Sequence, residues 1–401
     1  MRHMTILNLL PSRAVAVIGA GAMGSGIAQV AAQAGHEVYL VDVFEGAAAT
    51  ARDRLASMLA RLAAKGRITL AEADAATANI HVTDSAADLP ECALVIEAIR
   101  ENLDDKQALF AAVARSQPAG TLFASNTSSL DITAIAQGLP HPERVLGLHF
   151  FNPPPLMRLV EVIHGRLTSD ETLTAATQLM KAWQKAPVRC TSTPGFIVNR
   201  VARPFYGEAQ RMVEAGVADA ATIDLAMREV GGFRMGPMEL TDLIGQDVNL
   251  AVGTSVWEQT GHDERYTPTE LQRQLVADGR LGRKSGQGVF RYDGSGQPLD
   301  ASPDRALAVA LTAGPIVTNP VGRTVAMLVN EAVDLVARGE ASPEDVDTAM
   351  ELGTNYPKGP IAWGAEIGFD VIAEQLRHLD AAFPGGRYRP SPALGAHVEL
   401  T

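Results

Sequence analysis

Cysteine is scarce in this sequence, which has two such residues, Cys92 and Cys190, in 401 positions. Two cysteines cannot build the disulfide framework that stabilises small secreted domains. Both lie in apolar stretches, where a thiol usually behaves as a small core side chain. We therefore expect a reducing, cytoplasmic setting for the chain.

Long apolar runs and an excess of positive charge are also missing. No run reaches the roughly 18 apolar residues that a membrane-spanning helix requires, and Met1–Leu10 lacks the long apolar segment of a signal peptide. The 34 Lys and Arg residues against 46 Asp and Glu residues give a net charge of −12. This balance argues against nucleic acid and anionic membranes as partners, although a local basic cluster can still bind a polyanionic small molecule.

The remaining composition is that of an ordinary globular protein, with 46% hydrophobic residues. Residues 14 to about 190 alternate short β-branched runs with amphipathic patterns, which predicts an α/β domain with a mainly parallel sheet covered by helices on both faces. The expected strands are Ala14–Ile18, Glu37–Val43, Leu94–Ile99, Thr121–Ser125, Val145–His149, Leu159–Ile163 and Val188–Cys190.

The region after the sheet is helical and contains an internal repeat. Aligning Glu208 with Glu331 without a gap also aligns Asp224 with Asp347, and about a third of the positions from 208 to 248 are identical. We expect a duplicated helical unit whose two copies bury each other's apolar faces.

Four segments are expected along the chain. The α/β domain covers 12–193, and an all-α domain covers 194–292, with one short strand at Gly288–Tyr292. Residues 293–320 are rich in Gly, Pro, Ser and Asp around one short apolar helix and predict a linker. A second, degenerate helical copy covers 321–392.

A glycine-rich turn follows the first strand and predicts a dinucleotide site. Gly19, Gly21 and Gly24 form a G-x-G-x-x-G motif between a buried strand and the helical segment Ser25–Ala34, and Ala22 and Met23 complete the turn. This arrangement resembles a Rossmann unit, in which the helix N-terminus binds a pyrophosphate. Asp42, at the end of the next strand, can accept hydrogen bonds from the adenosine ribose. No Arg follows it and Glu45 is near, which favours NAD over NADP.

Polar residues after two later strands predict the catalytic centre. The segment Ser125–Ser129 follows one apolar strand, and His149 ends another, with Glu161 in the strand after it. In a parallel sheet the carboxyl ends of the strands line the ligand crevice. An imidazole is a suitable base for a hydroxyl proton at neutral pH, and a carboxylate can fix its tautomer. A structural ion pair or a core histidine fits these two residues equally well.

Three segments together resemble the L-3-hydroxyacyl-CoA dehydrogenase family: Asn126–Leu130, Gly147–Pro153 and Thr193–Arg200. The similarity extends from about Ala14 to Tyr292. Three further segments resemble a branch with a duplicated tail, which includes the 3-hydroxyadipyl-CoA dehydrogenases of phenylacetate degradation; they are Phe233–Pro237, Asn355–Pro357 and Arg387–Pro392.

The resemblance implies a role for each matching residue. His149 is implied as the catalytic base and Glu161 as its partner, while Ser128 holds the substrate's 3-oxygen and Asn199 orients the thioester. The expected NAD contacts, including the glycine turn, are Gly19, Gly21, Ala22, Met23, Gly24, Asp42, Ala98, Glu101, Lys106, Ser128, Asn152 and Lys284. The expected CoA contacts are Ser57, Lys65, Ser128 and Asn199, and no metal is expected.

Several of these residues also have simpler interpretations. Lys106 and Lys284 fit solvated surface charges, and Asn199 fits a helix cap. The second copy has Gly322 where Asn199 stands in the first. We therefore expect the second copy to serve packing or dimerisation and not a second active site.

The implied activity is reversible, NAD-dependent oxidation of an L-3-hydroxyacyl-CoA, as in β-oxidation of fatty acids or phenylacetate catabolism, with the acyl-CoA entering between the domains of a homodimer. Two alternatives stay open: a sugar-acid or polyol dehydrogenase that does not use CoA, and a non-catalytic NAD-binding structural relative. The acyl chain is open between a 3-hydroxyadipyl and a 3-hydroxybutyryl group. Arg158 and Arg234 are candidates for binding a distal carboxylate.

Overall fold

The computed structural model describes residues 13–395 and divides the chain into two compact units, Met1–Thr193 and Pro194–Thr401. The boundary falls where the alternating strand and helix pattern of the sequence gives way to helices alone. Within residues 13–395, none of the helices combines the length and apolarity that crossing a lipid bilayer requires.

The first unit is built on an eight-stranded sheet with the strand order β3-β2-β1-β4-β5-β6-β7-β8. Neighbouring strands are parallel except β6 and β7, which pair antiparallel. This confirms the predicted mainly parallel sheet. The strands are β1 (Ala14–Ile18), β2 (Val38–Val41), β3 (Ile80–Thr83), β4 (Cys92–Glu97), β5 (Leu122–Ser125), β6 (Val145–Phe150), β7 (Leu159–His164) and β8 (Ala186–Thr191).

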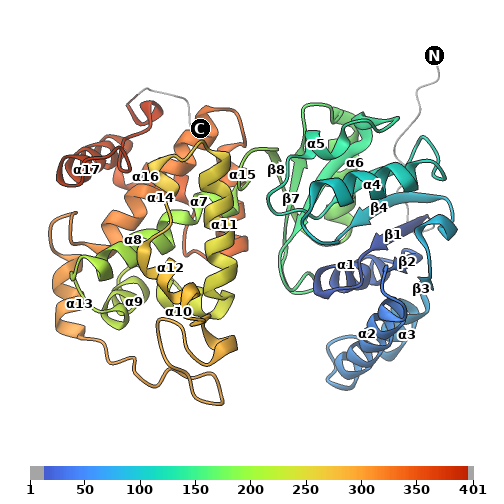
Figure 1. The fold of residues 1–401 in the computed structure, drawn as a ribbon, viewed down its shortest axis with the longest axis horizontal. Helices are drawn as coiled ribbons and strands as arrows, with labels where there is room; N and C mark the ends of the chain where they lie inside the picture. The colour runs from blue at the N-terminus through green and yellow to red at the C-terminus, as the bar shows by residue number, and fades with distance from the viewer. Residues whose placement is uncertain (1–12, 396–401) are drawn as a thin grey trace. The chain divides into compact units, whose positions relative to one another are not determined.

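Helices cover both faces of this sheet (Figure 1). One face packs against α1 (Ala22–Gln33) and α6 (Asp170–Ala182), with α2 (Ala47–Ala64) and α3 (Leu70–Ala78) beside α1 in the same apolar core. On the other side, α5 (Ile132–Ala136) contacts β6 and β7 and lies beside α4 (Leu103–Ala114). Side chains along a strand alternate between the two faces. Because Leu148 and Phe150 belong to the core beneath α1 and α6, His149 points to the opposite face.

The sheet differs from the sequence prediction in one additional strand and in the ends of several strands; β4, for example, covers Cys92–Glu97 where Leu94–Ile99 was expected. The edge strand β3 was not expected; it has four residues, of which only Ile80 is buried, so its apolar pattern is weak. The second strand ends at Val41 and not at Val43, whose side chain is 85% exposed. A strand at the edge of a sheet has a solvated side, and this weakens the hydrophobic signal from which strands are predicted.

The described part of the second unit is helical. The helices of its first half are α7 (Val198–Val201), α8 (Arg203–Glu214), α9 (Ala220–Glu229), α10 (Pro237–Ile244), α11 (Gln246–Gln259) and α12 (Glu270–Ala277). The others are α13 (Arg305–Thr312), α14 (Pro320–Ala337), α15 (Pro343–Thr354), α16 (Pro360–Ile367) and α17 (Phe369–Ala382).

The prediction of a strand at Gly288–Tyr292 is wrong. Isolated bridges join Gln287 to Gly282 and Arg291, and Tyr292 to Pro298. The backbone N–H groups of Val289 and Phe290 donate to the buried Asp242 carboxylate instead of to a neighbouring strand. A buried acid therefore replaces the ladder partner, and the apolar residues that suggested a strand pack as a loop.

The connection at 293–320 contains α13, which packs against α9 and α14. Its amphipathic sequence is explained by this contact, since Ala308 and Leu311 are buried. The connection is thus packed onto the helical unit over part of its length.

The two helical copies share one local device for starting a helix. In each copy a buried or half-buried aspartate accepts hydrogen bonds from two backbone N–H groups in the first turn of a helix that begins at Pro, and a Cβ atom on the preceding glycine would collide with that aspartate. The aspartates are Asp224 and Asp347, and their donors are Met238 and Glu239 in one copy and Ile361 and Ala362 in the other. The repeat seen in the sequence is therefore a repeat of structure.

Two buried glutamates join the copies reciprocally. Glu208 of the first copy accepts hydrogen bonds from three side chains of the second copy, and Glu331 of the second copy accepts from three side chains of the first. The partners of Glu208 are Arg323 at 2.7 Å, Arg387 at 2.8 Å and Tyr388 at 2.8 Å. The partners of Glu331 are Arg265 at 2.9 Å, Arg200 at 3.4 Å and Tyr266. The helices that carry the glutamates, α8 and α14, pack against each other.

Replacing Glu208 by Gln should destabilise the helical unit, because two buried guanidinium groups then lose their counter-charge. We expect a loss of about 3–5 kcal/mol in the free energy of unfolding at pH 7, measured by urea denaturation. The matched control is Asp53→Asn, which removes an exposed pair with Arg52 and should cost under about 1 kcal/mol.

The same variant tests the charge state of Glu208. Burial raises the pKa of Glu208, but the charges of Arg387 and Arg323 outweigh burial and lower it to about 2. An ordinary unfolded glutamate titrates near pH 4.3, so this stabilisation is complete above that pH and is lost as the pH falls toward 2. The difference between wild type and Glu208→Gln should therefore shrink between about pH 4 and pH 2; a constant difference would contradict the ion-pair account.

Candidate active site

The glycine turn after β1 is fixed by close packing at two of its three glycines. Gly19 has a φ of +105°, and a Cβ atom there would lie 2.5 Å from the Ala98 carbonyl oxygen. A Cβ atom at Gly24 would lie 1.7 Å from the carbonyl oxygen of Gly19. At Gly21 nothing lies within 4 Å, so the backbone there faces open space. This is the arrangement that lets a pyrophosphate approach the turn.

The surroundings of the turn fit NAD. The N-terminus of α1 has no side-chain cap and no acidic residue in its first turn, which leaves its N–H groups and positive dipole end for an anion. A cavity of about 740 Å³ lies in front of it, lined by residues that include Gly21, Ala22, Arg54 and Arg61. Met23 is partly buried and packs against the apolar core.

Asp42 has a structural role that the sequence did not indicate. Its carboxylate accepts hydrogen bonds from the backbone N–H groups of Ala20, at 2.6 Å, and Phe44, at 2.9 Å. Asp42 therefore ties the end of β2 to the glycine turn. Its side chain is partly exposed, and the contact with a ribose stays a prediction.

A buried ion-pair network lies at the end of β4. Lys106 Nζ is 2.6 Å from Glu97 Oε1 and 3.3 Å from Glu101 Oε2, and Lys106 is 1% exposed. The other Glu97 oxygen accepts a hydrogen bond from Ser125 Oγ at 2.6 Å. Lys106 is thus a buried, paired cation and not the solvated charge that was the simpler interpretation. Its contact with NAD stays a prediction.

Glu101 holds the loop that carries Ser128. Its Oε1 atom accepts hydrogen bonds from Thr127 Oγ1 at 2.6 Å and from the backbone N–H groups of Ser128 at 2.9 Å and Ser129 at 3.1 Å. Burial raises the pKa of the Glu101 carboxyl, but the charge of Lys106 and these hydrogen bonds outweigh it and lower the pKa. The ionised carboxylate therefore fixes the position of Ser128.

His149 and Glu161 meet across the antiparallel pair of β6 and β7. The two residues stand directly opposite each other in the strand register. His149 Nδ1 lies 2.6 Å from Glu161 Oε2, and the two residues are 7% and 0% exposed. A carboxylate at Nδ1 holds the ring as the tautomer protonated there, which leaves Nε2 as the basic nitrogen. The sequence expectation that these two residues lie at hydrogen-bond distance is correct.

The end of β6 is anchored to the neighbouring strand. Asn126, after β5, accepts a hydrogen bond from the Phe150 backbone N–H at 2.9 Å. Asn152 follows with an exposed side chain. The segment beyond it is held by Lys185, whose Nζ donates to the carbonyl oxygens of Pro154 at 2.5 Å and Met157 at 2.9 Å. The backbone that positions His149 and Asn152 is therefore fixed on both sides.

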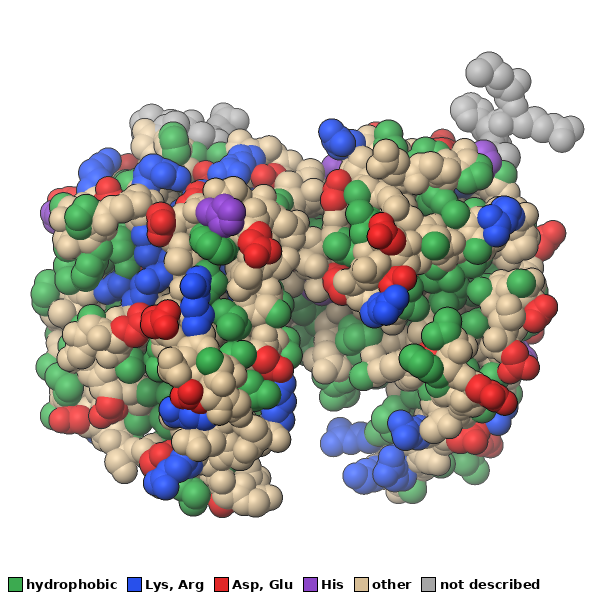
Figure 2. Space-filling view, viewed as in Figure 1, with side chains coloured by type: hydrophobic (Ala, Val, Ile, Leu, Met, Phe, Trp, Pro, Cys, Tyr) green, Lys and Arg blue, Asp and Glu red, His purple; other side chains and the backbone are tan. Residues whose placement is uncertain are grey.

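The remaining predicted residues lie elsewhere in the two units. Ser57 and Lys65 are exposed on and just after α2, a helix over which Lys and Arg side chains gather (Figure 2). Asn199 lies on α7 and Lys284 after α12, both in the second unit. Lys284 Nζ is 2.5 Å from Asp247 Oδ1, and its side chain is 45% exposed. The NAD and CoA contacts of these four residues stay predictions.

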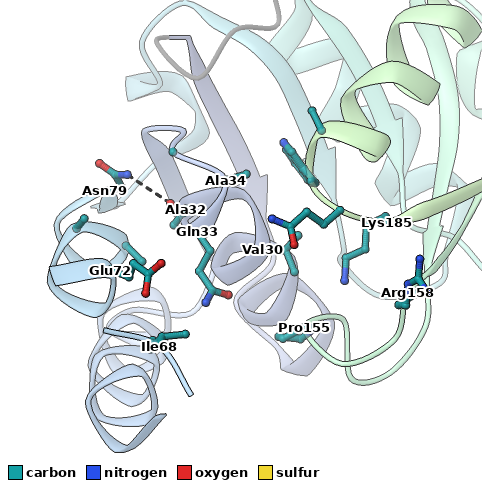
Figure 3. A pocket seen from close by; sticks show the side chains of 16 residues that line it. Val30, Ala32, Gln33, Ala34, Ile68, Glu72, Asn79, Pro155, Arg158 and Lys185 are labelled. Atoms are coloured by element: carbon teal, nitrogen blue, oxygen red, sulfur yellow. Dashed lines mark hydrogen bonds between the residues drawn. The ribbon is translucent and has the colours of Figure 1, made fainter. Parts of the chain in front are cut away.

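Of the two candidates for a distal carboxylate, Arg158 faces the wrong side of the sheet. It lines a cavity of about 490 Å³ together with Lys185 and with residues of α1 and α3 (Figure 3). This cavity lies on the side covered by α1 and α6, whereas His149 points to the other side. Arg234 is exposed in the loop between α9 and α10.

Sequence reasoning overlooked Glu97 as a residue that organises the site. Glu97 ends β4, inside the apolar run Ala93–Ile99, and it is fully buried. A single acid in an apolar strand is itself a signal, because a buried carboxylate needs a cation or several hydrogen-bond donors. Lys106, in the first turns of the following helix, is that cation.

Comparison with known proteins identifies the family. Residues 14–193 match the model described as 3-hydroxyacyl-CoA dehydrogenase, NAD binding domain. Residues 195–292 and 320–401 match the model of the C-terminal domain of the same family. The chain belongs to the 3-hydroxyacyl-CoA dehydrogenase family. The second match explains the internal repeat, since the C-terminal domain occurs twice.

Individual relatives agree with this assignment. The chain is 42% identical to the 3-hydroxyadipyl-CoA dehydrogenase of Escherichia coli over 95% of this chain and 96% of that protein. It is 41% identical to the human mitochondrial hydroxyacyl-coenzyme A dehydrogenase over 69% of this chain and 90% of that protein. The structure matches a 3-hydroxybutyryl-CoA dehydrogenase from Escherichia coli with a TM-score of 0.87 and 39% identity, over 95% and 97% of the two chains.

Replacing Glu101 by Ala should free the loop that carries Ser128. Hydrogen bonds to a charged group contribute about 1.5–3 kcal/mol each, so we expect kcat to fall at least about tenfold and the thermal midpoint to fall as well. Glu101→Gln keeps an acceptor oxygen and should retain most of the activity. Equal activity in both variants, whether high or low, would contradict this positioning role.

Proposed function

We propose that this dehydrogenase oxidises the 3-hydroxyl group of an L-3-hydroxyacyl-CoA to the 3-oxoacyl-CoA, reversibly, with NAD as the cofactor. The observation that carries the proposal is the buried hydrogen bond between His149 Nδ1 and Glu161 Oε2, 2.6 Å long, at the end of β6. It supplies a base whose orientation is fixed before substrate binds, next to a dinucleotide site in the same sheet.

In the proposed mechanism, His149 Nε2 removes the proton of the 3-hydroxyl group. The imidazole becomes an imidazolium, whose positive charge Glu161 stabilises at Nδ1. A positioned general base of this kind contributes about 10²–10⁴-fold to the rate. In the reverse direction the imidazolium returns the proton to the carbonyl oxygen.

NAD, when bound, supplies the nicotinamide ring that accepts the hydride from C3. Ser128 donates a hydrogen bond to the 3-oxygen and keeps it beside His149, in a loop that Glu101 fixes. Asn199 orients the thioester end of the substrate. Gly19, Gly21 and the N-terminus of α1 hold the pyrophosphate, and Asp42, Ala98, Asn152 and Lys284 provide further NAD contacts.

The CoA nucleotide is proposed to bind along α2. This helix carries Arg52, Arg54 and Arg61, and Lys65 follows its last turn. Such a cluster attracts phosphates even though the chain is acidic overall. Ser57 and Lys65 are the proposed contacts.

The family assignment does not favour the two alternative functions. A sugar-acid or polyol dehydrogenase would have no use for a basic helix at the CoA position. A non-catalytic relative would have no need of the buried Glu161 carboxylate beside His149. Burying a carboxylate is costly, so we expect it to be kept where it has a function. All three proposed catalytic residues of the first unit, His149, Glu161 and Ser128, are chemically competent.

The acyl group is proposed to be a dicarboxylic chain such as 3-hydroxyadipyl, or a short one such as 3-hydroxybutyryl, because the similar proteins carry these names. We also propose a cytoplasmic enzyme that forms a homodimer through its helical region. Analytical ultracentrifugation would distinguish a dimer from a monomer whose two helical copies cover each other.

Replacing His149 by Gln should remove the base without disturbing cofactor binding. We expect kcat for NADH oxidation by acetoacetyl-CoA to fall at least about 10²-fold, with the Kd for NADH nearly unchanged. His164→Gln, at the end of β7, is the matched control and should keep full activity. Retained turnover in His149→Gln would disprove the assignment.

The substrate class is tested with four compounds: 3-hydroxybutyryl-CoA, a long-chain 3-hydroxyacyl-CoA, 3-hydroxyadipyl-CoA and a free 3-hydroxy acid. We expect turnover of one or more CoA esters and none of the free acid, because the CoA nucleotide supplies binding energy. Activity on the free acid alone would favour the CoA-independent alternative.

A further inference from the structure

The buried arginines that join the two helical copies share one property: each is paired with a carboxylate. Four such residues are Arg200, Arg265, Arg323 and Arg387, and their partners are Glu331, Asp334, Glu340, Asp263 and Glu208. Pairing is expected, since an unpaired charge away from water is costly.

Arg203, the first residue of α8, is half-buried and differs from them. Within residues 13–395 no carboxylate oxygen lies within salt-bridge distance of its guanidinium. Nη1 donates to the Asn249 carbonyl oxygen at 3.3 Å, the group lies 5.0 Å from the centre of the Tyr206 ring, and the buried Nε atom has no hydrogen-bond partner in the described chain. Burial lowers the pKa of Arg203. The guanidinium therefore lacks a counter-ion.

A small cavity lies against Arg203. Its volume is about 30 Å³, and Arg203, Tyr206, Gln210 and Asn249 are among its lining residues. Gln210 is 1% exposed, its Oε1 atom accepts from Thr269 at 2.6 Å, and its Nε2 donor has no partner among residues 13–395. The cavity is thus bordered by two donors that lack acceptors, Arg203 Nε and Gln210 Nε2, and its volume is about twice the roughly 10–15 Å³ that one water molecule requires.

We propose that Arg203 binds a carboxylate-sized anionic group in this cavity. A guanidinium can give a carboxylate two parallel hydrogen bonds, which makes it the preferred side chain for such groups. The anion has two sources that share this chemistry: the distal carboxylate of a dicarboxylic acyl-CoA, or a free small anion. With the first source, Arg203 determines the choice of acyl chain.

The position of Arg203 in the chain favours the substrate as the source. Ala202 has helical φ and ψ angles and connects α7, which carries Asn199, to α8, which begins at Arg203, so the two side chains stand four residues apart on consecutive helices. This step rests on the proposed function, in which Asn199 orients the thioester. The second copy has Ala326 at the position of Arg203, so the site belongs to the first copy alone.

The decisive experiment compares 3-hydroxyadipyl-CoA with 3-hydroxyhexanoyl-CoA, two substrates of equal chain length that differ in the distal carboxylate. In Arg203→Met, we expect kcat/KM for the dicarboxylic substrate to fall about tenfold or more, mainly through KM, with little change for the other substrate. Arg211→Met is the matched control, because Arg211 lies on the same helix and donates to the Thr267 carbonyl oxygen. Arg203→Lys keeps the positive charge, so its kcat/KM for the dicarboxylic substrate should fall less than that of Arg203→Met.

A second measurement tests the free anion. The thermal midpoint is followed as sodium formate replaces sodium gluconate, an anion too large for the cavity, at constant ionic strength. Stabilisation by formate in wild type and Arg211→Met but not in Arg203→Met would assign the site to a free anion. This measurement also reports whether each variant folds.

Two results would overturn the proposal together: an unchanged preference between the two substrates in Arg203→Met, and no effect of formate on wild type. Absence of turnover with both CoA esters in wild type would instead contradict the proposed function, while the formate titration would still test the anion site.

Discussion

The reversal of strand direction between β6 and β7 is the constraint on which the site depends. Parallel strands place their carboxyl ends at one edge of the sheet, and His149 lies at that edge. Its partner Glu161 must reach the same edge from a neighbouring strand. Because β7 runs antiparallel to β6, its first half returns past the end of β6, and Glu161 stands opposite His149. A backbone ladder thereby sets the distance between the two proposed catalytic side chains, and no loop has to hold either of them.

The rest of the first unit fixes the surroundings of this pair through buried charge. The Glu97 carboxylate pairs with Lys106 and accepts a hydrogen bond from Ser125. The Glu101 carboxylate also pairs with Lys106 and accepts a hydrogen bond from the backbone N–H of Ser128. Gly19 touches the backbone at Ala98, the residue that follows Glu97. The glycine turn and the loop of Ser128 are therefore connected through one short segment after β4, and Glu101→Ala is expected to disturb the position of Ser128 first.

Much of this could be predicted from sequence, because the signals were local. Short sequence motifs predict the glycine turn, the buried strands and the repeat that contains Asp224 and Asp347. The edge strand β3 was missed because one face is solvated, and Gly288–Tyr292 was misread because its N–H partners are the carboxylate oxygens of Asp242, far away in sequence. The reciprocal pairing of Glu208 and Glu331, and the unpaired Arg203, depend on which helices pack together, and no periodicity encodes that.

We propose that His149 acts as a base because Glu161 stabilises its charged form. The most direct test is the single-turnover rate of NADH formation in Glu161→Gln, with substrate and NAD saturating. We expect a rate about 10²–10⁴-fold below wild type, with the Kd values for both ligands within about threefold of wild type. A single-turnover rate within about threefold of wild type would contradict it.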